Sequence, residues 1–205
     1  MSKRFTVLAV VSCVCLVASN IFETKIFAAG PLTLTGGFLI FPISYIINDC
    51  LTEVYGYRRA RFVILLAFLV NAAFVGVAQL VRILPPVPYC DAQPHLDYLF
   101  TADLRITVAS MLAFLLGSLV NSLVMDKMKS RQGDKGFGWR AVLSSLAGET
   151  LDSLIFFPIA FLGVGMSNLL VMMGTQIVLK TMYEVIILPV TTVYVRHLKK
   201  VENGS

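Results

Sequence analysis

Four ionisable residues lie deep within apolar stretches of the sequence, where such side chains are rare. Glu149 and Asp152 share one stretch, and Lys180 and Glu184 share another. An ionised side chain that faces lipid costs about 2.5 to 3.5 kcal/mol, so all four are expected to face the interior of a helix bundle. Their spacing agrees, because residues three or four positions apart share one face of a helix, and Gln176 extends the face of Lys180 and Glu184.

A second polar face lies near the end of an earlier apolar stretch. Its members are Tyr45, Asn48, Asp49 and Glu53. Two carboxylates one helical turn apart, Asp49 and Glu53, repel each other when both are ionised. The sequence therefore predicts that one of them is protonated or that a cation, Arg58 or Lys180, lies beside them.

The predicted interior holds four or five acids and one lysine. This balance favours a cation, a proton or a ligand rich in hydrogen-bond donors, and it argues against phosphate, nucleotide or carboxylate substrates. The alternative is that Lys180 pairs with Glu184 while the other acids stay neutral and hold helices together. Neither a metal site nor a disulfide framework is expected, because Cys13 and Cys15 point to different sides of a helix and no Cys-x-x-Cys pair occurs.

Membrane-spanning helices must position these side chains. The chain has 205 residues, of which 57% are hydrophobic and 14% are charged, whereas soluble domains carry about 25% charged residues. One bilayer crossing takes about 20 apolar residues. Six apolar stretches predict helices near residues 5–22, 33–52, 62–81, 106–125, 141–162 and 169–195. The expected fold is an all-α, multi-pass membrane protein with a single transmembrane domain over residues 1–205.

The distribution of Lys and Arg predicts how the helices are oriented. Thirteen basic residues fall on one side, namely Lys3, Arg4, Arg58, Arg59, Arg61, Lys127, Lys129, Arg131, Lys135, Arg140, Arg196, Lys199 and Lys200. Three fall on the other side, namely Lys25, Arg82 and Arg105. The positive-inside rule places the basic side in the cytoplasm, so both termini are expected there.

Two segments allow alternatives. The first apolar stretch follows Lys3 and Arg4 as in a signal peptide, but it continues to Phe22 and five more stretches follow, which favours an uncleaved helix. The outer segment 82–105, rich in proline and aspartate, is either a cover over an outward opening or an ordinary solvated loop.

Prolines occur in the same stretches as the interior charges. Pro42, Pro158 and Pro189 each fall in a charged span. Broken helices beside buried charges line binding sites in transporters, because freed carbonyl groups then face a cavity instead of lipid; a kink for packing alone is the alternative. The chain has no HExxH sequence and no P-loop, so neither an intramembrane enzyme nor an ATPase is expected.

Three motifs resemble those of the queuosine precursor transporter family, the solitary vitamin-uptake-like transporters. They are Asn48-Asp49-Cys50-Leu51-Thr52-Glu53-Val54-Tyr55-Gly56, Arg105-Ile106-Thr107-Val108-Ala109-Ser110, and Gly148-Glu149-Thr150-Leu151-Asp152-Ser153 followed by Ile159-Ala160-Phe161-Leu162-Gly163. The resemblance adds Asn48, Asp49, Glu53, Glu149 and Asp152 to the candidate substrate-binding residues. Tyr45, Gln176, Lys180 and Glu184 are candidates on the physical argument alone.

The resemblance implies a bacterial inner-membrane importer of queuosine precursors, 7-cyano-7-deazaguanine and its aminomethyl relative, which are later inserted into tRNA. It also implies a fold similar to the substrate-binding subunits of energy-coupling-factor vitamin transporters. The expected partners are a small 7-deazaguanine base and the lipid bilayer, with no cofactor and no bound nucleic acid. A proton-coupled importer of another small vitamin-like compound is the alternative, and a purely structural subunit is a further one. Energy coupling and oligomeric state, with a homodimer as one option, are left open.

Overall fold

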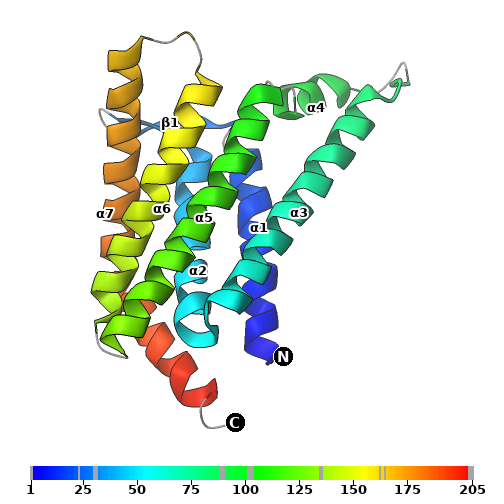
Figure 1. The fold of residues 1–205 in the computed structure, drawn as a ribbon. Coiled ribbons are helices and arrows are strands. Elements are labelled where there is room, and N and C mark those ends of the chain that lie inside the picture. The colour runs from blue at the N-terminus through cyan, green and yellow to red at the C-terminus, as the bar shows by residue number, and fades with distance from the viewer. Residues whose placement is uncertain are drawn as a thin grey trace.

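The computed structural model describes residues 2–22, 24–29, 32–87, 91–100, 104–133, 136–161, 163 and 165–202. The helices are α1 (Lys3–Phe22), α2 (Phe41–Tyr55), α3 (Tyr57–Ile83), α4 (Gln93–Phe100), α5 (Leu104–Gln132), α6 (Phe137–Ala160) and α7 (Met166–Glu202), with a short 3-10 helix, η1 (Gly36–Leu39). The long helices form a bundle, and both termini lie at the same end of it (Figure 1). We call this end the terminal end.

Six helical segments of the described chain are long and apolar enough to cross a membrane, which confirms the predicted number. They are Lys3–Phe22, Gly36–Tyr55, Tyr57–Ile83, Arg105–Gln132, Phe137–Ala160 and Leu169–Glu202. Successive spans run in opposite directions (Figure 1). The basic residues assigned to one side of the membrane therefore gather at the terminal end, at the starts of α1, α3 and α6 and the ends of α5 and α7. Lys135 of that set lies outside the described residues.

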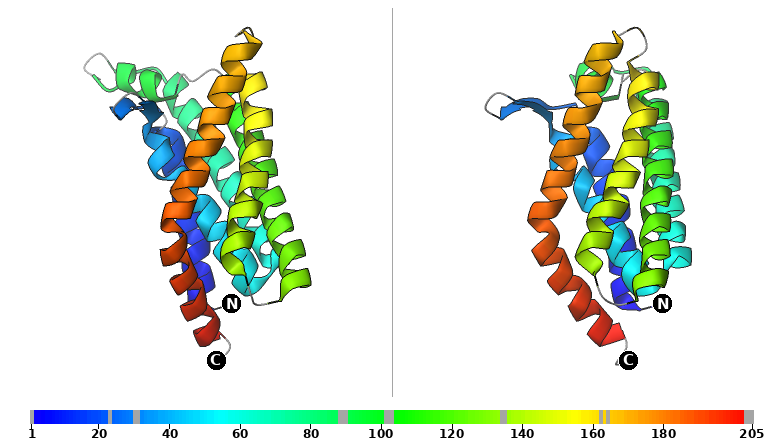
Figure 2. Two further views of the ribbon diagram at one scale, coloured as in Figure 1. Left: turned by 90° about the vertical axis from the view of Figure 1, so that its left-hand side faces the viewer. Right: turned by 60° about the vertical axis from the view of Figure 1, so that its left-hand side comes forward.

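An antiparallel β-hairpin follows α1, where the sequence predicted no strand. In it, β1 (Ile26–Ala29) pairs with β2 (Leu32–Thr35), and Ile26 lies opposite Thr35. The fold is otherwise helical, as expected, and the second span begins at Gly36 instead of near residue 33. The segment of β2 alternates leucine with threonine, and β-branched threonine fits a strand better than a helix. The hairpin lies at the end opposite the termini and projects from the bundle (Figure 2).

The three prolines in charged spans have two different structural roles. Pro42 lies in the first turn of α2 and so begins a helix instead of breaking one, because a helix tolerates proline where its missing N–H has no helical partner. Pro158 and Pro189 lie inside α6 and α7, as expected, and α7 curves along its length (Figure 2). Gly36 precedes α2, and a Cβ there would lie 2.6 Å from the Phe22 carbonyl oxygen, so only glycine allows this close approach to α1.

The outer segment between the third and fourth spans contains helix α4, which the sequence did not predict. The helix is tied to the end of α3. The Gln79 side chain donates a hydrogen bond to the Phe100 carbonyl at 2.8 Å, and the Gln93 side chain donates one to the Arg82 carbonyl at 3.0 Å. Because residues 88–90 and 101–103 lie outside the described chain, the choice between a cover and a solvated loop stays a prediction.

Helices α5 and α6 pack closely through two glycines. A Cβ on Gly117 would lie 2.9 Å from the Gly148 carbonyl oxygen, and a Cβ on Gly148 would lie 2.8 Å from the Gly117 carbonyl oxygen. Small residues allow backbones to approach in this way in membrane helix pairs. Tyr45 of α2 packs into the same junction, because its hydroxyl is 2.7 Å from the position of a Gly117 Cβ.

We expect Gly148→Ala to destabilise the protein by about 1 to 3 kcal/mol, because the new methyl group meets the backbone of α5. Gly174→Ala is the matched control, since a Cβ at Gly174 of α7 meets no atom within 4 Å. This control is expected to change stability by less than about 1 kcal/mol. Thermal unfolding in one detergent compares the two variants, and equal melting temperatures would contradict the tight packing of α5 on α6.

Candidate binding site

Lys180 of α7 lies at the centre of a buried group of charges. Its Nζ atom is 2.8 Å from Oε2 of Glu149 and 3.5 Å from Oδ2 of Asp152, both on α6. The same Nζ lies 4.3 Å from the centre of the Phe41 ring of α2. All three charged side chains are buried, as the cost of placing ions in lipid requires. Lys180 thus connects α7 to α6, whereas the alternative derived from the sequence paired it with Glu184 on its own helix.

A second pair of buried acids, Asp49 and Glu184, connects α2 to α7. Their carboxyl groups lie beside each other, and both side chains are at most 5% exposed. Ser145 of α6 donates its hydroxyl to Oδ2 of Asp49 at 3.5 Å. The structure therefore brings acids from three spans together with Lys180, in agreement with the predicted polar interior.

Polar side chains of α2 and α5 face each other next to these acids. Tyr45 lies beside Ser118, and Asp49 lies beside Asn121. Several of their buried atoms make no hydrogen bond of normal geometry within the described chain, namely Tyr45 Oη, Ser118 Oγ, Ser122 Oγ and both amide atoms of Asn48 and Asn121. A buried polar group without a partner costs about 1 to 3 kcal/mol. This face is therefore suited to a polar ligand that would complete those bonds.

The α5 side of this face was not predicted from the sequence. Ser118, Asn121 and Ser122 share one side of their helix by spacing, and all three are fully buried. The spacing was the available signal. This spacing does not by itself predict a binding site, because uncharged polar residues commonly hold membrane helices together and need no ligand.

Glu53 lies apart from the centre of the group, whereas Gln176 lies on the helix face of Lys180 by spacing. Glu53 is fully buried, and its Oε1 atom binds Nη2 of Arg140 at 2.9 Å and Nζ of Lys199 at 2.6 Å. These cations stand in place of the expected Arg58 or Lys180. Gln176 is half-buried on α7, one turn before Lys180. The structure thus places Glu53 in a separate ionic cluster at the terminal end, formed by Glu53, Arg140 and Lys199.

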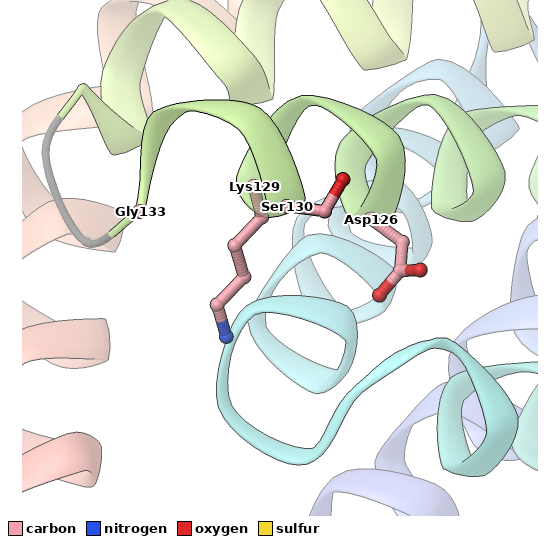
Figure 3. A pocket seen from close by; sticks show the side chains of 4 residues that line it. All are labelled: Asp126, Lys129, Ser130 and Gly133. Atoms are coloured by element: carbon pink, nitrogen blue, oxygen red, sulfur yellow. The ribbon is translucent and has the colours of Figure 1, made fainter.

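A hollow of about 310 Å³ opens beside this ionic cluster, lined by Asp126, Lys129, Ser130 and Gly133 (Figure 3). The Lys129 ammonium group donates to the backbone carbonyl of Glu53. The residues that line the hollow follow Asn121 in the chain and lie closer to the terminal end. The hollow is therefore a feature of the terminal end and not part of the polar group around Lys180.

Comparison with known families decides the class of this protein. A family model described as "Putative vitamin uptake transporter" matches residues 35–194. The chain belongs to this family. The matched residues contain α2, α5, α6 and the part of α7 that carries Lys180 and Glu184, so the whole polar group lies within them.

Two curated relatives of this chain carry the name "Probable queuosine precursor transporter". The one from Bacillus subtilis (strain 168) is 26% identical over 149 residues, which cover 72% of this chain and 65% of the relative. The one from Haemophilus influenzae (strain ATCC 51907 / DSM 11121 / KW20 / Rd) is 27% identical over 128 residues, which cover 62% of this chain and 52% of the relative. The chain thus spans between about half and two thirds of these relatives. No solved structure matches it.

These relationships agree with the motif resemblance found in the sequence. All of its motifs lie within the matched residues 35–194. The family description and the names of the relatives are those of transporters, which supports a membrane carrier over an enzyme.

Proposed function

We propose that this vitamin uptake transporter imports queuosine precursors, 7-cyano-7-deazaguanine and 7-aminomethyl-7-deazaguanine, across the bacterial inner membrane for tRNA modification. One observation carries the proposal: a group of acids and amides is buried around Lys180 inside apolar helices. The names of the relatives supply the class of substrate, and the buried group supplies a place suited to it.

The chemistry of a 7-deazaguanine ring fits this group. The ring presents N1–H and a 2-amino group side by side, and one carboxylate can accept both hydrogen bonds. Asp49, Glu149, Asp152 and Glu184 are the proposed acceptors. The aminomethyl precursor adds a cation that a further acid can hold, whereas the cyano precursor is neutral. The buried group has more acids than the single ammonium group of Lys180 neutralises, so it is suited to both precursors.

Aromatic rings next to Lys180 are suited to the face of the base. The rings of Phe41 and Tyr45 lie on one side of α2 with their centres 5.7 Å apart, and both are buried. Stacking of a base on an aromatic side chain contributes about 1 to 3 kcal/mol. We therefore propose Tyr45, together with Asn48 and Gln176, as residues that line the substrate site.

The terminal end is proposed to face the cytoplasm. The excess of Lys and Arg at this end supports that orientation through the positive-inside rule, and it puts both termini of a single six-span domain, residues 1–205, inside the cell. The ionic cluster of Glu53 would then lie on the release side of the substrate. The likeness to the substrate-binding subunits of energy-coupling-factor transporters remains a prediction.

The decisive experiment uses a bacterial host that cannot make queuosine precursors and has no importer of its own. The host is supplied with external 7-cyano-7-deazaguanine, with and without this gene, and queuosine is measured in its tRNA. Queuosine is expected only in cells that carry the gene. Equal queuosine in both cultures, with the protein present in the membrane, would refute the proposed function.

A second candidate is a proton-coupled importer of another small vitamin-like compound. The proximity of two buried acids on α2 and α7, Asp49 and Glu184, which both lie beside Ser145, favours it, because two buried carboxyl groups close together are stable when one holds a proton. Competition separates the candidates. Unlabelled deazaguanines should suppress uptake under the first proposal and have no effect under the second.

A further inference from the structure

We infer that Asn48 of α2 and Asn121 of α5 bind the edge of a planar heterocycle and make the site selective for a lactam, in which a ring N–H lies beside a C=O. The inference rests on the proposed function, because 7-deazaguanines carry such an edge. It adds two residues with a definite task, one of which no sequence motif indicated.

Both amides are buried without a hydrogen bond of normal geometry. Asn48 is 1% exposed and Asn121 is 0% exposed, and neither their nitrogen nor their oxygen atoms make a hydrogen bond of normal geometry within the described chain. An amide side chain offers two N–H donors and a carbonyl acceptor. Polar atoms buried in an apolar setting are costly unless they are paired. Two buried amides whose hydrogen bonds are incomplete point to a ligand that pairs with them.

The two amides lie on two helices that pack against each other, α2 and α5. Asp49, which follows Asn48 in α2, lies beside Asn121. On the other side, the Cβ of Asn121 is 2.9 Å from the position that a Cβ on Gly148 would occupy. The close packing of α5 on α6 thus fixes Asn121 next to Asp49. Tyr45 lies 3.0 Å from the same Gly148 position, and Asn48 shares the helix face of Tyr45 by spacing, so both amides lie where α2, α5 and α6 meet; we call this the amide row.

This row differs in charge from the group around Lys180. There, two acids on α6 face one ammonium group, and that group suits charged or strongly polar substituents. The amides of Asn48 and Asn121 are neutral, so they suit the neutral ring edge. An amide N–H can donate to the lactam C=O while the Asp49 carboxyl accepts the ring N–H. An adenine-type edge presents a bare nitrogen acceptor at that position and would leave the carboxyl group unpaired.

Binding measurements on the purified full-length chain test the inference. The probes are 7-cyano-7-deazaguanine, guanine and hypoxanthine, which carry the lactam, and adenine, which does not. The variants Asn48→Leu and Asn121→Leu keep nearly the same side-chain size and remove the polar atoms. Each is expected to weaken binding of the lactam rings by about tenfold or more. The melting temperature of the ligand-free protein is expected to stay the same or rise, since orphaned polar atoms have been removed.

Asn71→Leu is the matched control. Asn71 of α3 is also buried, at 2% exposure, but its side-chain oxygen accepts a hydrogen bond from the Asn20 amide at 2.9 Å. The expected result is the reverse of the one for Asn121→Leu. The melting temperature falls because Asn20 loses its partner, and the affinity for the lactam rings stays unchanged.

The outcomes separate the inference from the proposed function. If the wild type binds guanine or hypoxanthine but not the deazaguanine, the function fails and the inference stands. If the wild type binds the deazaguanine and both leucine variants bind it equally well, the inference is overturned and the function stands. Binding of adenine as tight as that of guanine, or melting temperatures that fall as far as in Asn71→Leu, would also overturn the inference. A wild type that binds none of the four rings refutes both.

Discussion

Glu149→Gln is expected to reduce uptake of 7-deazaguanine precursors by about 100-fold while the protein still inserts into the membrane. Glutamine keeps the shape of the side chain but removes the charge that would accept the donors of the base. A hydrogen bond to a charged group contributes about 1.5 to 3 kcal/mol, and losing two such bonds to the ring corresponds to at least this factor. Initial rates of labelled precursor uptake, normalised to the amount of protein in the membrane, provide the measurement.

The effect on folding is expected to be small, because Lys180 keeps Asp152 at 3.5 Å as an ionic partner. Asp152→Asn provides the second arm, since Glu149 then keeps Lys180 paired at 2.8 Å. Glu202→Gln is the control: Glu202 lies at the end of α7 next to Arg4 and Tyr55, far along the helix from Lys180. Normal import by both Glu149→Gln and Asp152→Asn would remove these acids from the proposed site.

The number of spans could be predicted because it depends mainly on one large free energy, that of transferring apolar residues from water into the bilayer. A helix that crosses a bilayer needs about 20 apolar residues, and charged segments separate six such stretches clearly in this sequence. The hairpin of β1 and β2 could not be predicted in the same way. Its strands have four residues each, which is too short for apolar alternation to distinguish a strand from the start of a helix.

The buried acids could be predicted, but their partners could not. Burial of Glu149 and Lys180 follows from the cost of placing each in lipid, and spacing fixes which residues share a helix face. Which two faces meet depends on packing. Here the glycines of α5 and α6 set how closely those helices meet. The sequence therefore offered Glu184 as a partner for Lys180 on the same helix, whereas the structure supplies Glu149 from the next one.

Uncharged polar residues gave the weakest indication of the candidate site in the sequence. Asn121 costs far less in an apolar helix than a carboxylate does, so its presence alone did not require a partner or a ligand. Only the structure reveals that its amide is fully buried beside Asp49 and makes no hydrogen bond of normal geometry. Arg140 and Lys199 have a role that the sequence did not predict. They were counted as cations that orient the chain, and the structure places both on the buried carboxylate of Glu53.

Glu53→Leu is expected to lower the free energy of unfolding by about 3 to 5 kcal/mol, because it leaves the buried guanidinium group of Arg140 without its carboxylate. The Arg140 side chain is 0% exposed, so water cannot replace Glu53. A hydrogen bond from Nη1 to the Gly133 carbonyl at 2.8 Å does not neutralise the charge. Lys199 is affected less, since its side chain is 24% exposed and can turn to solvent. Denaturant titration in mixed micelles gives the measurement.

A double-mutant cycle separates the ion pair from the volume that the side chains fill. Glu53→Leu with Arg140→Leu is expected to recover most of the stability lost in Glu53→Leu, because replacing both ions leaves no unpaired charge in the bundle. Arg4→Leu is the control, since its pair with Glu202 at 3.9 Å involves a side chain that is 44% exposed, and such pairs contribute about 0 to 1 kcal/mol. A double variant as unstable as Glu53→Leu would mean that these side chains stabilise α2 and α6 by packing and not by charge.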